Sequence, residues 1–191
     1  PPFCMDRIHS LCIKCLDTGR KRSFVNDSLL PLSTEDANRL AALGHKNIEP
    51  LSVGIKVLED AEYITGHNIV DFDENAIKLH KPNYSHNAAI SDTLVMSRMV
   101  YADIKEQDFR MAAKGRLDGR LIGTHGLEGW GQRLGLHKGD YKKERETKLK
   151  EKHKEAGVPA PTAEELHEYV WGTWNVDMHD YMMLDIDVNF L

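Results

Sequence analysis

The C-terminal segment places a tyrosine and an aspartate four residues apart in a sequence that is typical of a helix. Residues 175–191 contain no Gly or Pro and are rich in Met and Leu, which favours a helix. Tyr181 and Asp185 would then lie one turn apart on a side that Met178 and Met182 make largely apolar. An unpaired carboxylate is unfavourable there, and a metal ion or a cationic partner would remove that cost. The alternative is an ordinary surface Asp, with Tyr as a packing residue.

A second candidate site follows a short predicted strand at residues 62–66. This strand leads to Asn68, and Phe72 and Asp73 then stand near the start of a helix predicted over residues 67–81. A carboxylate just beyond the end of a strand lies where open α/β sheets place their ligands. The alternative is an Asp that only compensates the helix dipole. Together with Tyr181 and Asp185, Asp73 indicates a binding site.

Length, composition and charge describe an ordinary globular domain. The 191 residues are 41% hydrophobic and 29% charged, enough for a sizeable core. The net charge of −5 argues against a mainly basic surface for duplex DNA, but acidic metal ligands and local basic patches can coexist with it. No apolar run reaches the roughly 18 residues that span a membrane, and no signal peptide is evident. With three cysteines, an odd number, we expect a reduced, cytoplasmic protein without a membrane partner.

The elements that must position these residues are strands followed by alternating helices and strands. Alternating residues at 7–16 and 22–26 predict a hairpin. Further strands are expected at 62–66 and 88–90, and helices at 33–43, 50–58, 67–81, 94–101, 105–114, 127–135 and 141–154, after residue 162, and at the C-terminus. This order predicts an α/β or α+β fold with a mixed central sheet flanked by helices.

Two basic segments could contact phosphates. Arg116 and Arg120 lie in a Gly-containing loop at residues 115–123, although a solvated loop is the alternative. Residues 141–154 hold seven Lys and Arg residues and read as a solvated helix or a flexible arm.

The two candidate sites resemble motifs of the 3′–5′ exonuclease domains of family A DNA polymerases. The second motif of these domains has an Asn followed by an aromatic residue and an Asp, as in Asn68, Phe72 and Asp73. Their third motif is Tyr-x-x-x-Asp, as in Tyr181 and Asp185. The segment 91–98 resembles the segment that these domains place after their fourth strand. The segments 125–135 and 138–142 are similar to the polymerases of T-seven-like podophages, so the resemblance runs from about residue 7 to residue 191.

The resemblance implies a single ribonuclease-H-like exonuclease domain over residues 1–191, part of a longer polymerase of a phage acting in the bacterial cytoplasm. Its partners would be a single-stranded DNA 3′ end and the polymerase domain of the same polypeptide. The family uses two divalent ions, Mg²⁺ or Mn²⁺.

Site roles follow from the same resemblance. Asp185 would bind the ion that activates water, and Asp73 would support the second ion, partly through water. Tyr181 would orient the attacking water. The substrate would be contacted by Asn68, Phe72, Arg116 and Arg120. We therefore expect Asp73 and Asp185 to lie within reach of a common ion, with the Tyr181 hydroxyl directed toward it.

The chain departs from the family at the first motif, Asp-x-Glu. Only residues 1–6 precede the predicted hairpin, and Asp6 has no Glu two residues later. Either the first strand was cut away or replaced, or the domain is a degenerate exonuclease that binds nucleic acid or protein. An RNA exonuclease of the same superfamily is a third possibility. As written, the chain lacks two of the four metal-binding carboxylates and is expected to be a poor nuclease.

Overall fold

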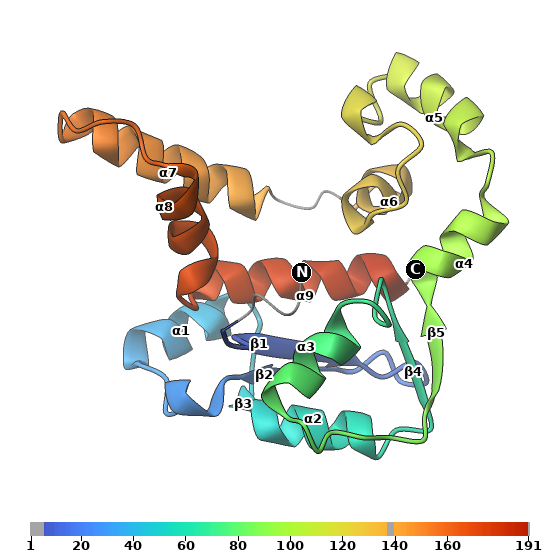
Figure 1. The fold of residues 1–191 in the computed structure, drawn as a ribbon, viewed down its shortest axis with the longest axis horizontal. Coiled ribbons are helices and arrows are strands. Elements are labelled where there is room, and N and C mark those ends of the chain that lie inside the picture. Colours follow the sequence, from blue (N-terminus) through green and yellow to red (C-terminus); the bar gives the residue numbers. More distant parts are fainter. Residues whose placement is uncertain (1–5, 137–139, 191) are drawn as a thin grey trace.

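A computed structural model of the chain describes residues 6–136 and 140–190. The long helix α9 (Val176–Phe190) runs through the middle of the molecule (Figure 1). Strands and helices from the first half of the chain lie on one side of it, and two helical arms lie on the other (Figure 1). Residues 1–5, 137–139 and 191 lie outside the described residues. The prediction about the Asp-x-Glu motif concerns residues 1–6, most of which are therefore not described.

The predicted hairpin is confirmed. Strands β1 (Ser10–Lys14) and β2 (Lys21–Val25) pair antiparallel, with Ser10 opposite Val25. The turn between them contains Gly19 at φ +67°, a conformation that glycine adopts without steric cost. The short strand β3 (Glu49–Pro50) pairs parallel to β2, so this sheet is mixed, as expected.

The other two strands form a separate sheet. Strands β4 (Tyr63–Gly66) and β5 (Ala89–Asp92) pair parallel, with Gly66 opposite Asp92. In the described part of the chain neither β4 nor β5 pairs with the β1-β2-β3 sheet. The α/β class is thus confirmed, but the single central sheet that we expected is present as two small sheets.

Helices occupy most of the remaining chain. They are α1 (Thr34–Ala42), α2 (Leu51–Glu59), α3 (Asp73–His80), α4 (Thr93–Val100), α5 (Ile104–Ala113), α6 (Leu127–Leu134), α7 (Tyr141–Glu155) and α8 (Ala163–His167), followed by a π-helical turn at Glu168–Gly172 and α9. Local signals explain several starts. The Ser33 hydroxyl accepts from the Asp36 N–H at 3.1 Å to cap α1, and Thr162 and Glu165 form a capping box before α8.

The α3 helix corrects one prediction. It begins at Asp73 and not at residue 67, because the chain first makes a turn with Asn68 at φ +63°. This left-handed conformation is incompatible with a continuous right-handed helix, and Asn tolerates it better than most residues. Because α3 starts only after this turn, Asp73 is the first residue of the helix.

Helix α9 is fixed to the hairpin by polar and apolar contacts. The Cys12 thiol donates to the Met183 sulfur at 2.8 Å, and Lys14 and Lys21 both contact the Asp187 carboxylate, Lys14 at 3.1 Å. At its start, Val176 is fully buried with Val25, Leu40 and Trp174. These contacts set the rotation of α9 about its axis, and hence the direction of its other side chains. Over the described residues, no helix is long and apolar enough to cross a membrane.

Candidate functional site

The turn after β4 is shaped by its backbone and by one carboxylate. The Asp92 carboxylate accepts from the backbone N–H of Asn68 at 2.9 Å and of Val70 at 3.3 Å. A Cβ added to Gly66 would lie 2.8 Å from the Ile69 side chain, so a larger residue does not fit. Asn68 therefore contributes its backbone conformation to the site, a role that the sequence motif did not reveal.

Asp92 also caps the next helix. It accepts from the Leu94 N–H at 2.9 Å and from the Val95 N–H at 3.4 Å at the start of α4. Burial raises the pKa of this carboxyl, but hydrogen bonds from the Asn68, Val70, Leu94 and Val95 N–H groups outweigh burial and hold the pKa below its usual value. One ionised side chain thus joins the ends of β4 and β5.

Replacing Asp92 is expected to loosen this junction. Asp92→Ala should lower the free energy of unfolding by about 2–3 kcal/mol, because a helix cap is lost and the turn N–H groups lose their acceptor. Urea unfolding at pH 7 measures the change. Asp103 stands at the equivalent position before α5 but makes no capping hydrogen bond. Asp103→Ala is therefore the matched control, expected to cost less than about 0.5 kcal/mol, and equal losses would contradict the assignment.

The Asp73 carboxyl has a raised pKa. Its side chain reaches solvent, yet protein atoms crowd it, and this burial raises the pKa to about 6. The negative charges of Asp92 and Glu74 raise it further, against a backbone hydrogen bond that lowers it. A carboxylate held among other carboxylates is unfavourable when ionised, and a bound cation would relieve that cost.

This shift predicts a pH-dependent effect of Asp73→Asn. Because the folded-state pKa lies above the ordinary value of 3.8, folding becomes less favourable as the pH rises from about 4 to about 6. At pH 7.5 without metal, Asp73→Asn should therefore stabilise the chain, by about 1 kcal/mol or less because solvent screens an exposed group. The gain should shrink below pH 5. Urea unfolding at both pH values tests this, with Asp71→Asn as a control for removing one negative charge from the same turn. An equal gain at both pH values would refute it.

The residue after Asp73 fixes the first turn of α3. Glu74 is buried and accepts from the Tyr84 hydroxyl at 3.0 Å and from His86 Nε2 at 3.1 Å, and Lys78 Nζ lies 3.1 Å away. Burial raises the pKa of Glu74, but these three partners outweigh it and lower the pKa. Sequence reasoning missed Glu74, because its partners lie in a loop with no periodic pattern.

Helix α9 reaches the same junction through Asn189. The Thr93 hydroxyl lies 2.6 Å from Asn189 Oδ1 and 3.3 Å from the Gly66 carbonyl oxygen. Figure 1 shows the C-terminal end of α9 beside the start of α4. Asp185 lies one turn before Asn189 on the same side of the helix. It points about 200° away from Asp187, which faces the hairpin, so Asp185 is directed away from β1.

Tyr181 lies where α6, α7 and α9 meet. Its ring packs against Tyr141 with centroids 5.6 Å apart. Burial raises the pKa of the Tyr181 hydroxyl, and the nearby negative charges of Glu128 and Asp140 raise it further. The expected direction of this hydroxyl, toward an ion shared by Asp73 and Asp185, stays a prediction.

The predicted substrate contacts lie at the surface. Phe72 is 42% exposed beside Asp73, consistent with a side chain that could meet a base. Arg116 is exposed. Arg120 is also exposed, but its guanidinium bonds Asp118 at 2.9 Å and contacts Glu128 at 3.4 Å. Arg120 would have to exchange these partners for a phosphate.

The segment 125–135, which is similar to phage polymerases in sequence, contributes Arg133 to a buried ion pair with Asp108. Arg133 Nε and Nη2 donate to the two Asp108 oxygens at 2.8 and 2.7 Å, and the side chains are 3% and 0% exposed. The Gly123 N–H adds a 2.7 Å bond to Asp108. The pair joins α5 and the following loop to α6, a role that the sequence analysis did not foresee.

The two carboxylates of the candidate site suit a hard cation, but two ligands are few for a metal site. Asp73 and Asp185 offer oxygen ligands of the kind that Mg²⁺ and Mn²⁺ prefer. Over residues 6–136 and 140–190, no group of three or more His, Cys, Asp or Glu side chains is placed to hold a metal ion. A metal site at Asp73 and Asp185 therefore stays a prediction.

Part of the chain is related to phage DNA polymerases. It is 36% identical over 101 residues to the DNA-directed DNA polymerase of Escherichia phage T7, and equally to that of Enterobacteria phage T3. Each match covers 51% of this chain and 12% of the relative. No protein-family model matches the chain.

Proposed function

We propose that this chain is the 3′–5′ exonuclease, or proofreading, region of a phage-type DNA polymerase, acting on single-stranded DNA 3′ ends. The similarity to two phage DNA polymerases supports the polymerase context. The Asp92–Thr93 junction carries the site. Asp92 holds the turn that leads to Asp73, and Thr93 contacts Asn189, one turn beyond Asp185. In this proposal, Asp73 and Asp185 come from distant parts of the sequence and would meet near the ends of β4 and β5.

Each residue of the candidate site would have its own role in hydrolysis. Asp73 and Asp185 would hold Mg²⁺ or Mn²⁺, which when bound would activate water and neutralise charge at the phosphate. Tyr181 would orient the attacking water, and the exposed Phe72 would contact the terminal base. Asn68 would set the turn that presents Asp73, since its N–H is held by Asp92.

A catalytically degenerate domain that binds nucleic acid or protein is the second candidate. The observation that favours it is that residues 6–136 and 140–190 place no group of three or more His, Cys, Asp or Glu side chains to hold a metal ion, so Asp73 and Asp185 stand there without the Asp-x-Glu pair of the family's first motif. Two carboxylates without that pair should hold two cations weakly, since less negative charge separates them.

The deciding experiment measures degradation of a 3′-labelled oligonucleotide. The chain is compared with a version extended by a strand that bears Asp-x-Glu, in Mg²⁺ and in Mn²⁺, on DNA and on RNA. Strong cleavage of DNA by the extended chain supports the exonuclease. Preference for RNA would reassign the substrate, and inactivity of both forms with retained oligonucleotide binding would support the binding module.

A further inference from the structure

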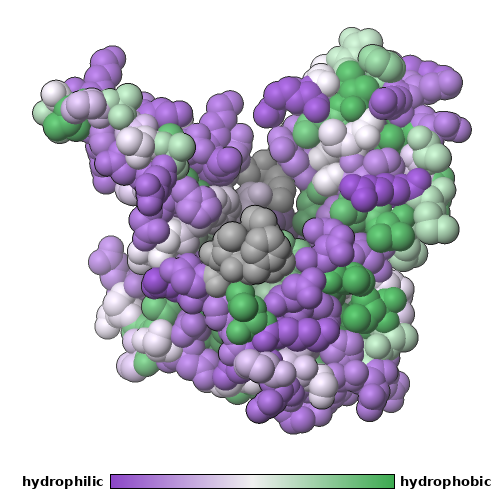
Figure 2. Space-filling view, viewed as in Figure 1, coloured by the Kyte–Doolittle hydropathy of each residue, from purple (hydrophilic) through white to green (hydrophobic). Residues whose placement is uncertain are grey.

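Helix α7 forms, with α8, an arm that projects from the body on the side of α9 away from the sheets (Figure 1). The surface of this arm is mainly hydrophilic (Figure 2). The neighbouring arm of α5 and α6 lies across a notch from it (Figure 2). The arm lies on the same side of α9 as Tyr181, whose ring packs against Tyr141 at the start of α7.

The charge of α7 is opposite to that of the chain as a whole. Its 15 residues include seven Lys and Arg and four Glu, whereas the chain has 25 Lys and Arg against 30 Asp and Glu. The helix is therefore a local cationic element on an acidic protein, and such a distribution attracts polyanions to one place.

One side of α7 is anchored, so the segment is not the flexible arm that its composition allowed. The Tyr141 hydroxyl donates to the Val170 carbonyl at 2.9 Å. Arg145 donates to the Tyr169 carbonyl at 2.9 Å, and its guanidinium lies 4.1 Å from the Tyr169 ring centroid. These contacts hold α7 on the segment before α9 and fix which residues face outward.

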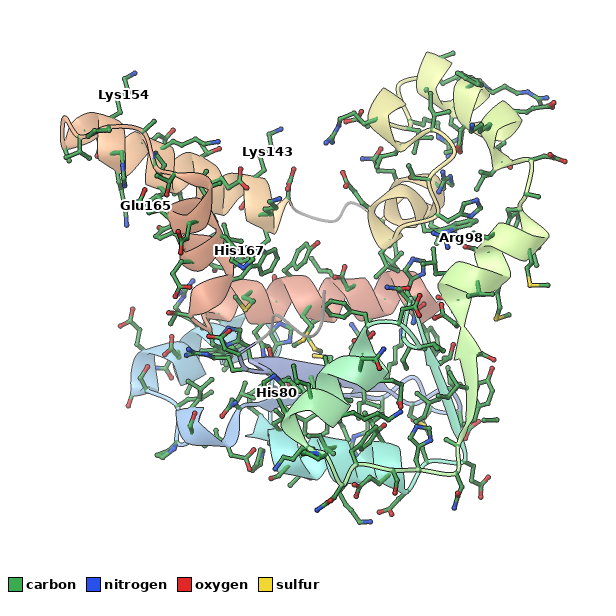
Figure 3. All side chains as sticks on the ribbon, viewed as in Figure 1. His80, Arg98, Lys143, Lys154, Glu165 and His167 are labelled. Atoms are coloured by element: carbon green, nitrogen blue, oxygen red, sulfur yellow. The ribbon has the colours of Figure 1, made fainter. Side chains whose placement is uncertain are left out.

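The opposite side carries a row of lysines. Lys143, Lys150 and Lys154 are spaced by seven and four residues, which places them on one side of a helix over about 16 Å. Figure 3 shows Lys143 and Lys154 pointing to the same side of the arm. Among the described residues neither of these two forms an ion pair, and Lys150 has one contact, to Glu146 at 3.7 Å. The row therefore has charge available for a ligand.

The first residue of α7 contacts α9 in its middle. Tyr141, the first residue of α7, packs against Tyr181, and Tyr181 stands one turn from Asp185. Lys143 follows two residues later, on the side of α7 turned away from Tyr141, so a strand with its 3′ end near Asp185 would pass around this end of α7 to reach the row. An acidic protein surface would satisfy the charges equally well, but this adjacency favours nucleic acid.

We propose that Lys143, Lys150 and Lys154 bind backbone phosphates of a single strand whose 3′ end occupies the candidate site. The proposal rests on the proposed function for the identity of the ligand. Glu144 and Glu151 flank the row and should limit its affinity. Binding would be independent of sequence and would weaken with salt, as for other grooves that follow a single-stranded backbone.

The test is the affinity of the full chain for a fluorescent 20-nucleotide oligo-dT, measured by anisotropy in EDTA at several salt concentrations. The triple variant K143Q/K150Q/K154Q should bind about tenfold more weakly at 50 mM salt, and the slope of log K against log[salt] should fall by about 2 for three lost phosphate contacts. Glu151→Lys, which adds a cation beside the row, should tighten binding.

The matched control is K46Q/K56Q/K114Q, which removes the same charge from exposed lysines on other elements. It should retain the unmodified affinity. Equal loss in both triple variants, unchanged binding in K143Q/K150Q/K154Q, or equally effective competition by poly-glutamate would overturn the proposal. Because binding is measured in EDTA, without hydrolysis, a failed nuclease assay with lysine-dependent binding would reject only the catalytic proposal.

Discussion

Extending the chain with a strand that bears Asp-x-Glu is expected to raise its Mg²⁺-dependent hydrolysis of single-stranded DNA by about 10³-fold or more, the scale of losing a preorganised electrostatic element. The unextended chain offers Asp73 and Asp185 but no bridging carboxylates. Two cations a few ångströms apart repel each other strongly unless anionic ligands lie between them. Occupancy and transition-state stabilisation should therefore both rise when the pair is supplied.

The structure offers a place for such a strand. In the described part of the chain, β1 pairs only with β2, and β4 pairs only with β5. Each therefore has an edge whose backbone groups could pair with an added strand. A strand that paired with β4 could bring its carboxylates toward the end of that strand, where Asp73 follows.

Two controls make the result interpretable. An added strand that bears Asn-x-Gln should still pair with the sheet but should not raise the hydrolysis of single-stranded DNA. Asp185→Asn in the active extended chain should abolish the gain. Vigorous metal-dependent cleavage by the unextended chain that survives Asp185→Asn would show that the assigned active site is wrong.

The sequence predicted what depends on local pattern. The hairpin followed from alternation around a turn, and the helices at 33–43 and 94–101 followed from their local residue patterns. Each depends on residues within a few positions of one another, where backbone geometry limits the choices. The late start of α3 was missed because it depends on Asn68, whose turn is held by Asp92 24 residues away.

Long-range pairing was harder to predict. The division into two sheets depends on which strands find each other, and apolar alternation carries no information about partners. The sequence analysis did not single out Glu74 or Arg133, since charged side chains are rarely buried without a partner. Their burial became evident only with Tyr84, His86 and Asp108 in place. Asp73 and Asp185 were found from a strand end and from helical spacing, their roles came from the motif resemblance, and their shared ion stays a prediction.

The buried Asp108–Arg133 pair should be the most costly ion pair to break. Asp108→Ala or Arg133→Met alone is expected to lower the free energy of unfolding by about 3–5 kcal/mol, because the remaining charge would be buried without compensation. Arg120→Ala, at the exposed pair with Asp118, should cost less than about 1 kcal/mol. Urea unfolding of the full chain at pH 7 compares the three variants.

The same pair predicts a pH dependence and a rescue. Hydrogen bonding from Arg133 lowers the pKa of Asp108 against the effect of burial. Its stabilisation is therefore fully present above the ordinary Asp value of about 4 and is lost as the pH falls further. The double variant Asp108→Leu/Arg133→Met should recover much of the stability lost in either single variant, because no unpaired charge remains. Single variants no less stable than Arg120→Ala, or a double variant whose loss is the sum of both, would show that the pair does not hold α5 to α6.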